Sequence, residues 1–226
     1  MKPKRIILIR HGESHGNIDK SFYSHTPDYA IYLTKIGTEQ AKEVGHKIKD
    51  IIKDESYCVY YSPYFRAHQT MDLAVNVIDN ELMYNVARRF KREEPRIREQ
   101  EYAGSLRITT DENFETEREK FGKFFYRLHG GESGADVYDR VSDFIGTLHR
   151  DFEKKDYPEN CLIFAHGMTN RLFLVRWLHI PIEEFETWKN PRNGEMYILE
   201  LQKNGKYRLI TEIAQHPSGY GYKYKT

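Results

Sequence analysis

Short apolar runs and longer amphipathic segments alternate along this chain. The run RIILIR (5–10) is apolar between two arginines, and the runs at 57–62 and 160–167 have the same character. Continuous apolar runs of this length are typical of strands that are buried on both faces of a parallel sheet. The pattern therefore predicts three buried strands at these positions.

Segments with apolar residues at helical spacing separate or follow these strands. The predicted helices span 33–54, 63–78, 135–152 and 168–178. Thr34 is expected to cap the first helix, and Pro63 fits the first turn of the second. An alternation of strands and helices of this kind predicts an α/β fold with a mainly parallel sheet.

The rest of the chain gives weaker patterns. Residues 195–201 and 206–213 flank an Asn-Gly pair, which predicts a hairpin. Residues 83–110 are dense in Arg and Glu and are expected to be irregular. Because no linker composition divides the chain, we expect one domain over 1–226, with 83–130 as an irregular or helical cap-like insertion over the site.

Composition narrows the class of protein. The 226 residues include 35 Lys and Arg against 34 Asp and Glu, which argues against a nucleic-acid binder that works through bulk charge. No apolar run approaches the roughly 20 residues of a membrane span, and Arg10 ends the first apolar run too early for a signal peptide. Cys58 and Cys161 lie in apolar runs and are expected to be buried free thiols. We therefore expect a cytoplasmic protein with no membrane or nucleic-acid partner.

Basic side chains stand at the ends of the three predicted strands. Arg10 and His11 close the first, Arg66 follows the second, and His166 closes the third. Because ligands bind beyond the carboxyl ends of parallel strands, we expect these side chains to meet at one edge of the sheet. Arginine matches the oxygens of a phosphate, whereas the same arginines would oppose a metal cation. The cluster favours a dianionic phosphoryl ligand and no metal ion.

With a phosphoryl ligand, a histidine at this edge of the sheet could act as a nucleophile. A neutral imidazole nitrogen can attack phosphorus and form a covalent phosphohistidine, while fixed positive groups hold the other oxygens. The leaving alkoxide then needs a proton, which a carboxyl group kept protonated by the phosphate charge can supply. Glu99 and Glu101, in the segment 96–104, are the candidates for this acid.

Six sequence blocks match one known family and occur in that family's order. They are LIRHGES followed by Asn17, LTKIGTEQA, YSPYFRAHQT, IREQEYAG, GGES at 130–133, and FAHG. With these blocks the chain resembles the histidine phosphatase superfamily over nearly its whole length. The resemblance implies a phosphoglycerate mutase-like fold, which is a three-layer α/β/α sandwich, and a chemistry without a metal or other cofactor.

The resemblance also implies roles for seven residues. They are the phosphorylated nucleophile His11, the phosphate-binding Arg10 and Arg66, the second pocket histidine His166, the proton donor Glu99, and the pocket-lining Asn17 and Gly167. The family's acid falls on Glu99 by the spacing of IREQEY. The family's following glycine falls on Ala103, so Glu101 stays an alternative proton donor. The other histidines are expected to be solvated or packing side chains.

Three functions fit this set of residues. In a phosphatase, water hydrolyses the phosphohistidine formed from a small phosphomonoester. In a mutase, the phosphoryl group returns to a bound sugar-acid, but cofactor-dependent mutases of the family carry a longer, proline-containing insert where 105–129 is short here. A catalytically silent phosphate-binding protein would lack one of the central residues, and all are present. We therefore expect a phosphomonoester phosphatase, in an oligomeric state that the sequence leaves open.

Overall fold

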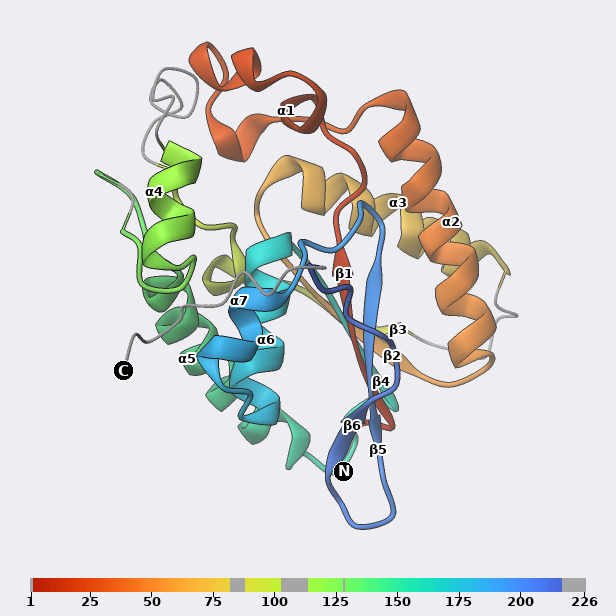
Figure 1. Ribbon diagram of the computed structural model, residues 1–226. Coiled ribbons are helices and arrows are strands. Elements are labelled where there is room, and N and C mark those ends of the chain that lie inside the picture. Colours follow the sequence, from red (N-terminus) through yellow and green to blue (C-terminus); the bar gives the residue numbers. More distant parts are fainter. Residues whose placement is uncertain (1, 82–87, 103–113, 128, 217–226) are drawn as a thin grey trace.

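The computed structural model describes residues 2–81, 88–102, 114–127 and 129–216. At their centre is a six-stranded sheet in the order β3-β2-β4-β1-β5-β6 (Figure 1). The strands are β1 (Arg5–Arg10), β2 (Tyr57–Tyr61), β3 (Arg88–Glu93), β4 (Asn160–Ala165), β5 (Met196–Leu201) and β6 (Tyr207–Leu209). The first four strands run parallel, whereas β5 is antiparallel to β1 and β6 is antiparallel to β5.

Helices cover both faces of this sheet (Figure 1). On one face lie α2 (Lys35–Ile52) and α3 (Phe65–Glu81), and on the other α5 (Gly134–Phe152) and α6 (Gly167–Leu178). The shorter helices are α1 (His15–Ile18), α4 (Phe114–Phe121) and α7 (Ile182–Thr187). Within the described ranges, none of the helices combines the length and the apolar character needed to cross a bilayer. The arrangement confirms the expected three-layer α/β/α sandwich with a mainly parallel sheet.

Strand β1 shows why its sequence is continuously apolar. Ile6 and Leu8 belong to the core on the α5–α6 side, whereas Ile7 and Ile9 belong to the core on the α2–α3 side. All four side chains are fully buried. Because successive side chains of a strand point to opposite faces, a sheet covered on both sides needs apolar residues at every position.

Several local predictions are confirmed. The Thr34 hydroxyl accepts a hydrogen bond from the Gly37 N–H at the start of α2, as an N-cap does. The hairpin between β5 and β6 turns at Gly205, whose φ of 75° is favourable for glycine. Cys58 and Cys161 are register partners on β2 and β4, and both are buried free thiols.

The prediction that 83–110 is irregular is wrong for part of that segment. Arg88–Glu93 form β3, which pairs with β2 at the edge of the sheet. Its sequence RRFKRE has neither an apolar run nor an alternation, and an edge strand tolerates such charge because one side of it lacks a neighbouring strand. Of the expected insertion, 83–87, 103–113 and 128 lie outside the described residues. Its role as a cap over the site stays a prediction.

Candidate active site

The carboxyl ends of β1 and β4 lie next to each other. The His11 N–H, just after β1, donates to the backbone oxygen of Ala165 at the end of β4 over 3.1 Å. His166 follows Ala165, and the ring centroids of the two histidines are 5.2 Å apart in an edge-on contact. The structure thus brings both histidines to one edge of the sheet, as the order of elements predicts.

Two neighbours hold His11 in one tautomer. Its Nδ1 lies 2.7 Å from the backbone oxygen of Gly12, which can only accept, and the Arg66 Nε–H donates to its Nε2 over 3.3 Å. Nδ1 therefore carries the proton and Nε2 presents a lone pair. Burial, and then the charges of Arg66 and Arg10, lower the pKa of His11 well below its ordinary value. The ring is thus neutral near pH 7.

Arg66, from the first turn of α3, is nearly fully buried beside His11. Its Nη1 donates to the Asp28 carboxylate over 2.8 Å and to the Asp28 backbone oxygen over 2.7 Å. The guanidinium also lies 5.0 Å from the centroid of the Tyr64 ring. A buried cation is costly without such partners, and here they fix its position.

Arg10 and His166 each keep one nitrogen without a partner. Arg10 Nη1 donates to the backbone oxygen of Pro191, but its Nε has no hydrogen-bond partner in the described part of the chain. His166 Nε2 lies 2.8 Å from the Ser62 hydroxyl, which also accepts from the Tyr64 N–H. His166 Nδ1 is likewise buried without a partner among the described residues. Since buried polar groups are seldom left unsatisfied, these two nitrogens indicate a place for a ligand atom.

Glu99 reaches the same region from the loop after β3. Its carboxylate accepts from the Met168 N–H, in the first turn of α6, over 3.4 Å, and from the Gln100 N–H over 3.1 Å. The start of a helix favours a nearby negative charge. The Glu101 N–H instead donates to the Glu132 carboxylate, the Glu132 N–H donates to the Glu101 backbone oxygen, and Glu101 does not line the pocket formed by the described residues. Of the two candidate glutamates, Glu99 is the one that lines the pocket.

A pocket of about 160 Å³ lies at this edge of the sheet. Five of the seven predicted site residues line it, namely Arg10, His11, Asn17, Arg66 and Glu99. His166 and Gly167 are not among its lining residues: His166 is fully buried against His11, and Gly167 opens α6. A Cβ at Gly167 would lie 2.0 Å from Asn190 Oδ1, so glycine is what allows Asn190 to approach.

Asn17 is held by its carboxamide oxygen. That oxygen accepts from the Ser14 N–H and the Asn193 amide, each over 3.0 Å. The same Asn193 amide donates to the backbone oxygen of His11 over 3.2 Å. Because these bonds engage only the oxygen of Asn17, its amide nitrogen is the group that it can offer to a ligand.

Sequence reasoning missed the other lining residues, which are Lys20, Tyr23, Asp28, Tyr102, Arg118 and Asn190. They come from the short 3-10 helices Lys20–Ser24 and Asp28–Ala30, from loops and from α4, where no strand end or long apolar period marks a position. Only Asp28 had a signal, because a buried arginine needs a carboxylate partner. The sequence could not say which of the 34 acidic residues that partner is.

The pocket is suited to an anion rather than to a cation. Four of its side chains are basic, namely Arg10, Lys20, Arg66 and Arg118, and its two carboxylates, Asp28 and Glu99, already accept hydrogen bonds. In the ranges that the structure describes, no three His, Cys, Asp or Glu side chains are grouped to hold a metal ion.

Comparison with known families agrees with this geometry. The family model of the histidine phosphatase superfamily (branch 1) matches residues 6–211. The chain belongs to this superfamily. The family assignment confirms the resemblance seen in the sequence blocks.

Relatives of this chain occur in plants and yeast. Phosphoglycerate mutase-like protein AT74H of Arabidopsis thaliana is 40% identical, over 92% of this chain and 77% of the relative. Broad-range acid phosphatase DET1 of Saccharomyces cerevisiae is 29% identical, over 94% of this chain and 90% of the relative. A solved mycobacterial glucosyl-3-phosphoglycerate phosphatase superposes with a TM-score of 0.70 at 19% identity, covering 94% of this chain and 100% of that one. This likeness shows the shared fold.

Proposed function

We propose that this protein hydrolyses small phosphomonoesters through a phosphohistidine on His11. The observation that carries the proposal is the neutral His11 ring, which is protonated on Nδ1 and has its Nε2 lone pair beside the Arg66 guanidinium in an anion-binding pocket. Membership of the histidine phosphatase superfamily supports it, and so does the relative named as a broad-range acid phosphatase.

In the first step, His11 Nε2 attacks phosphorus, and a P–N bond forms while the ester P–O bond breaks. Glu99, which takes up a proton beside the bound phosphate dianion, delivers that proton to the leaving oxygen, so the alcohol departs neutral. Arg10 and Arg66 neutralise the phosphoryl oxygens. Those oxygens would also supply acceptors for Arg10 Nε and His166 Nδ1, the two nitrogens that lack a partner among the described residues.

In the second step, water attacks the phosphohistidine. The Glu99 carboxylate takes a proton from the water, the new P–O bond forms, and the P–N bond breaks. Inorganic phosphate leaves, and His11 Nε2 recovers its lone pair. The hydrogen bond from His11 Nδ1–H to the Gly12 oxygen holds the ring through both steps and stabilises the positive charge that develops on it.

Replacement of the nucleophile tests this mechanism. We expect His11→Ala to abolish hydrolysis of p-nitrophenyl phosphate, because among the described residues His11 is the one histidine that lines the pocket. His15→Ala is the matched control, since His15 lies four residues away and stacks on Phe22. Its activity should stay within about twofold of the unsubstituted protein. Turnover retained in His11→Ala would overturn the mechanism.

The mutase alternative is tested with substrates. The Arabidopsis relative is named mutase-like, so a panel of phosphorylated metabolites should be assayed with and without 2,3-bisphosphoglycerate. Hydrolysis that needs no bisphosphate is the expected result. Isomerisation of phosphoglycerate that depends on the bisphosphate would replace the phosphatase proposal with a mutase.

A further inference from the structure

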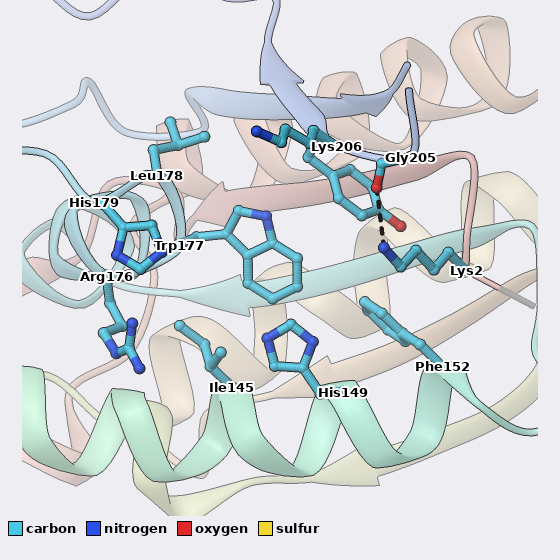
Figure 2. Close-up of a pocket in the computed structure, with 11 residues that line it drawn as sticks. Lys2, Ile145, His149, Phe152, Arg176, Trp177, Leu178, His179, Gly205 and Lys206 are labelled. Atoms are coloured by element: carbon cyan, nitrogen blue, oxygen red, sulfur yellow. Dashed lines mark hydrogen bonds between the residues drawn. The ribbon is translucent and has the colours of Figure 1, made fainter. Parts of the chain in front are cut away.

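A second pocket lies at the far end of the sheet from the candidate active site. It has a volume of about 470 Å³ and lies between the ends of α5 and α6 and the β5–β6 hairpin (Figure 2). Helix α6 begins directly after His166 and ends at Leu178, which lines this pocket. Its 12 residues span about 18 Å, so the two pockets are separate.

The wall of this pocket is apolar and rich in rings. Its apolar lining residues are Ile145, Phe152, Trp177, Leu178 and Tyr207. The Trp177 indole stacks on His149 at 5.0 Å between centroids, and the Tyr207 ring meets it edge-on at 5.5 Å. The indole also stacks on Phe173 at 5.5 Å, so a further flat ring would contact the exposed edges of this wall in an offset or edge-on arrangement.

Three basic side chains surround this wall, and none of the described residues that line the pocket carries a carboxylate. They are Lys2, Arg176 and Lys206, with Arg176 and Lys2 on opposite sides of the indole in Figure 2. The Lys2 ammonium donates to the Gly205 oxygen over 2.9 Å, which ties the N-terminal segment to the hairpin. Across the described part of the chain, the side chains of Arg176 and Lys206 form no ion pair or hydrogen bond. With a net charge of only +1, the composition does not explain this local excess.

The positive charges of Lys2 and Arg176 affect the pKa of His149. Burial, followed by the charges of Lys2 and Arg176, lowers its pKa, while the nearby Glu153 acts in the other direction. The neighbourhood therefore disfavours one more positive charge, and it would favour an anion.

A third pocket, of about 690 Å³, lacks these features. Its basic residues Lys47, Lys189 and Arg192 stand with Glu195 and Glu212, and its lining includes no aromatic side chain from the part of the chain that the structure describes. A pocket with charges of both signs and no rings favours no particular class of ligand. The pocket at Trp177 is therefore distinguished by its rings and basic residues, and not by its volume.

We propose that the pocket around Trp177 binds a nucleoside phosphate, an organic phosphate that carries a flat aromatic base. Lys206 contacts the phosphate, the charges of Lys2 and Arg176 add to the attraction for an anion, and the base packs against the exposed edges of the ring wall at Trp177. Ligand pockets commonly measure about 300–1,000 Å³, so this one accommodates a mononucleotide. The inference goes beyond the proposed phosphatase activity and does not rest on it.

Calorimetric titration of AMP tests the proposal. The full chain with His11→Ala is used so that AMP is not hydrolysed during the titration. We expect binding that Lys206→Glu weakens about tenfold and that Lys203→Glu leaves within about twofold. Lys203 is an exposed residue of the same hairpin turn that does not line the pocket, so both variants change the charge equally. Equal thermal unfolding temperatures exclude a folding defect in either variant.

Two further probes separate the parts of the ligand. Pyrophosphate and adenosine should each bind at least tenfold more weakly than AMP, because each lacks one half of the recognised group. Absence of AMP binding at millimolar concentration, equal weakening by both lysine substitutions, or pyrophosphate that binds as tightly as AMP would each overturn the proposal. Hydrolysis of AMP by the His11→Ala chain would refute the proposed nucleophile but leave the binding result to stand.

Discussion

The two pockets at opposite ends of the sheet hold their basic side chains in different ways. In the candidate active site, Arg66 is 3% exposed and is fixed by Asp28 and His11. In the pocket at Trp177, Lys2 and Lys206 are exposed. A buried, oriented charge is preorganised to stabilise charge that develops during a reaction, whereas an exposed one attracts ligands and is screened by salt. Substitutions at the first end should change rates, and those at the second should change binding alone.

The largest expected effect at the catalytic end, after loss of the nucleophile, is that of Glu99→Gln. General acid help is worth roughly 10²–10⁴ in rate, so hydrolysis of alkyl phosphates should fall by about that factor. p-Nitrophenyl phosphate should lose far less, because its leaving group needs no proton. Glu101→Gln is the matched control and should retain activity on both substrates. Equal losses on both substrates in Glu99→Gln would assign the acid elsewhere.

Asp28→Asn should have the next largest effect. Arg66 keeps its neighbours but loses the carboxylate that orients Nη1, and we expect kcat/KM to fall by roughly 10². Lys206→Gln, which removes a basic group at the other pocket, should leave the same kcat/KM within about twofold. If the two substitutions changed kcat/KM equally, the basic groups of the candidate active site and of the pocket at Trp177 would not differ in their effect on the reaction.

Gly167→Ala should affect stability by a smaller amount. The added Cβ would lie 2.0 Å from Asn190 Oδ1, so Asn190 must shift, at a cost of about 1–3 kcal/mol in the free energy of unfolding. Gly146→Ala, in α5, meets only Arg150 Nη1 at 3.7 Å and should gain about 0.5–1 kcal/mol. Urea unfolding of both variants measures the difference, and a stabilised Gly167→Ala would show that Asn190 is not held there.

The smallest effect concerns pH. Burial, and next the charge of Arg66, lowers the pKa of both His11 and His166 well below 6.5. Their ring resonances in NMR spectra should therefore stay at the neutral positions between pH 8 and about 6. Because the unfolded chain binds these protons near pH 6.5 and the folded chain does not, the free energy of unfolding should fall as the pH drops below that value. Midpoints near 6.5 for both rings would contradict the burial argument.

Strong patterns made most of the fold predictable. The buried strands β1, β2 and β4 are nearly uniform in apolar character, and the long helices have a clear period. β3 was missed because its sequence RRFKRE is that of an edge strand, whose pairing depends on β2 and not on its own pattern. Local sequence therefore predicts the centre of this sheet better than its edge.

Some residues of the candidate site were predictable from the sequence, and others were not. Arg10, His11 and His166 were predictable because they stand at the ends of strands whose order brings them together. Asp28 was not predictable. Its contact with Arg66 joins two segments that are 38 residues apart, and no sequence pattern marks the segment that carries Asp28. The side chains at the strand ends follow from topology, whereas a positioning partner such as Asp28 follows from packing that one sequence does not reveal.

Trapping of the phosphoenzyme tests the central claim most directly. The chain is mixed briefly with a phosphomonoester, quenched in alkali and digested, and the phosphorylated peptide is located by mass spectrometry. The neutral, Nδ1-protonated ring predicts a single acid-labile phosphate on Nε2 of His11. Phosphate on another residue, or continued turnover with no phosphate on His11 at any time, would contradict the account.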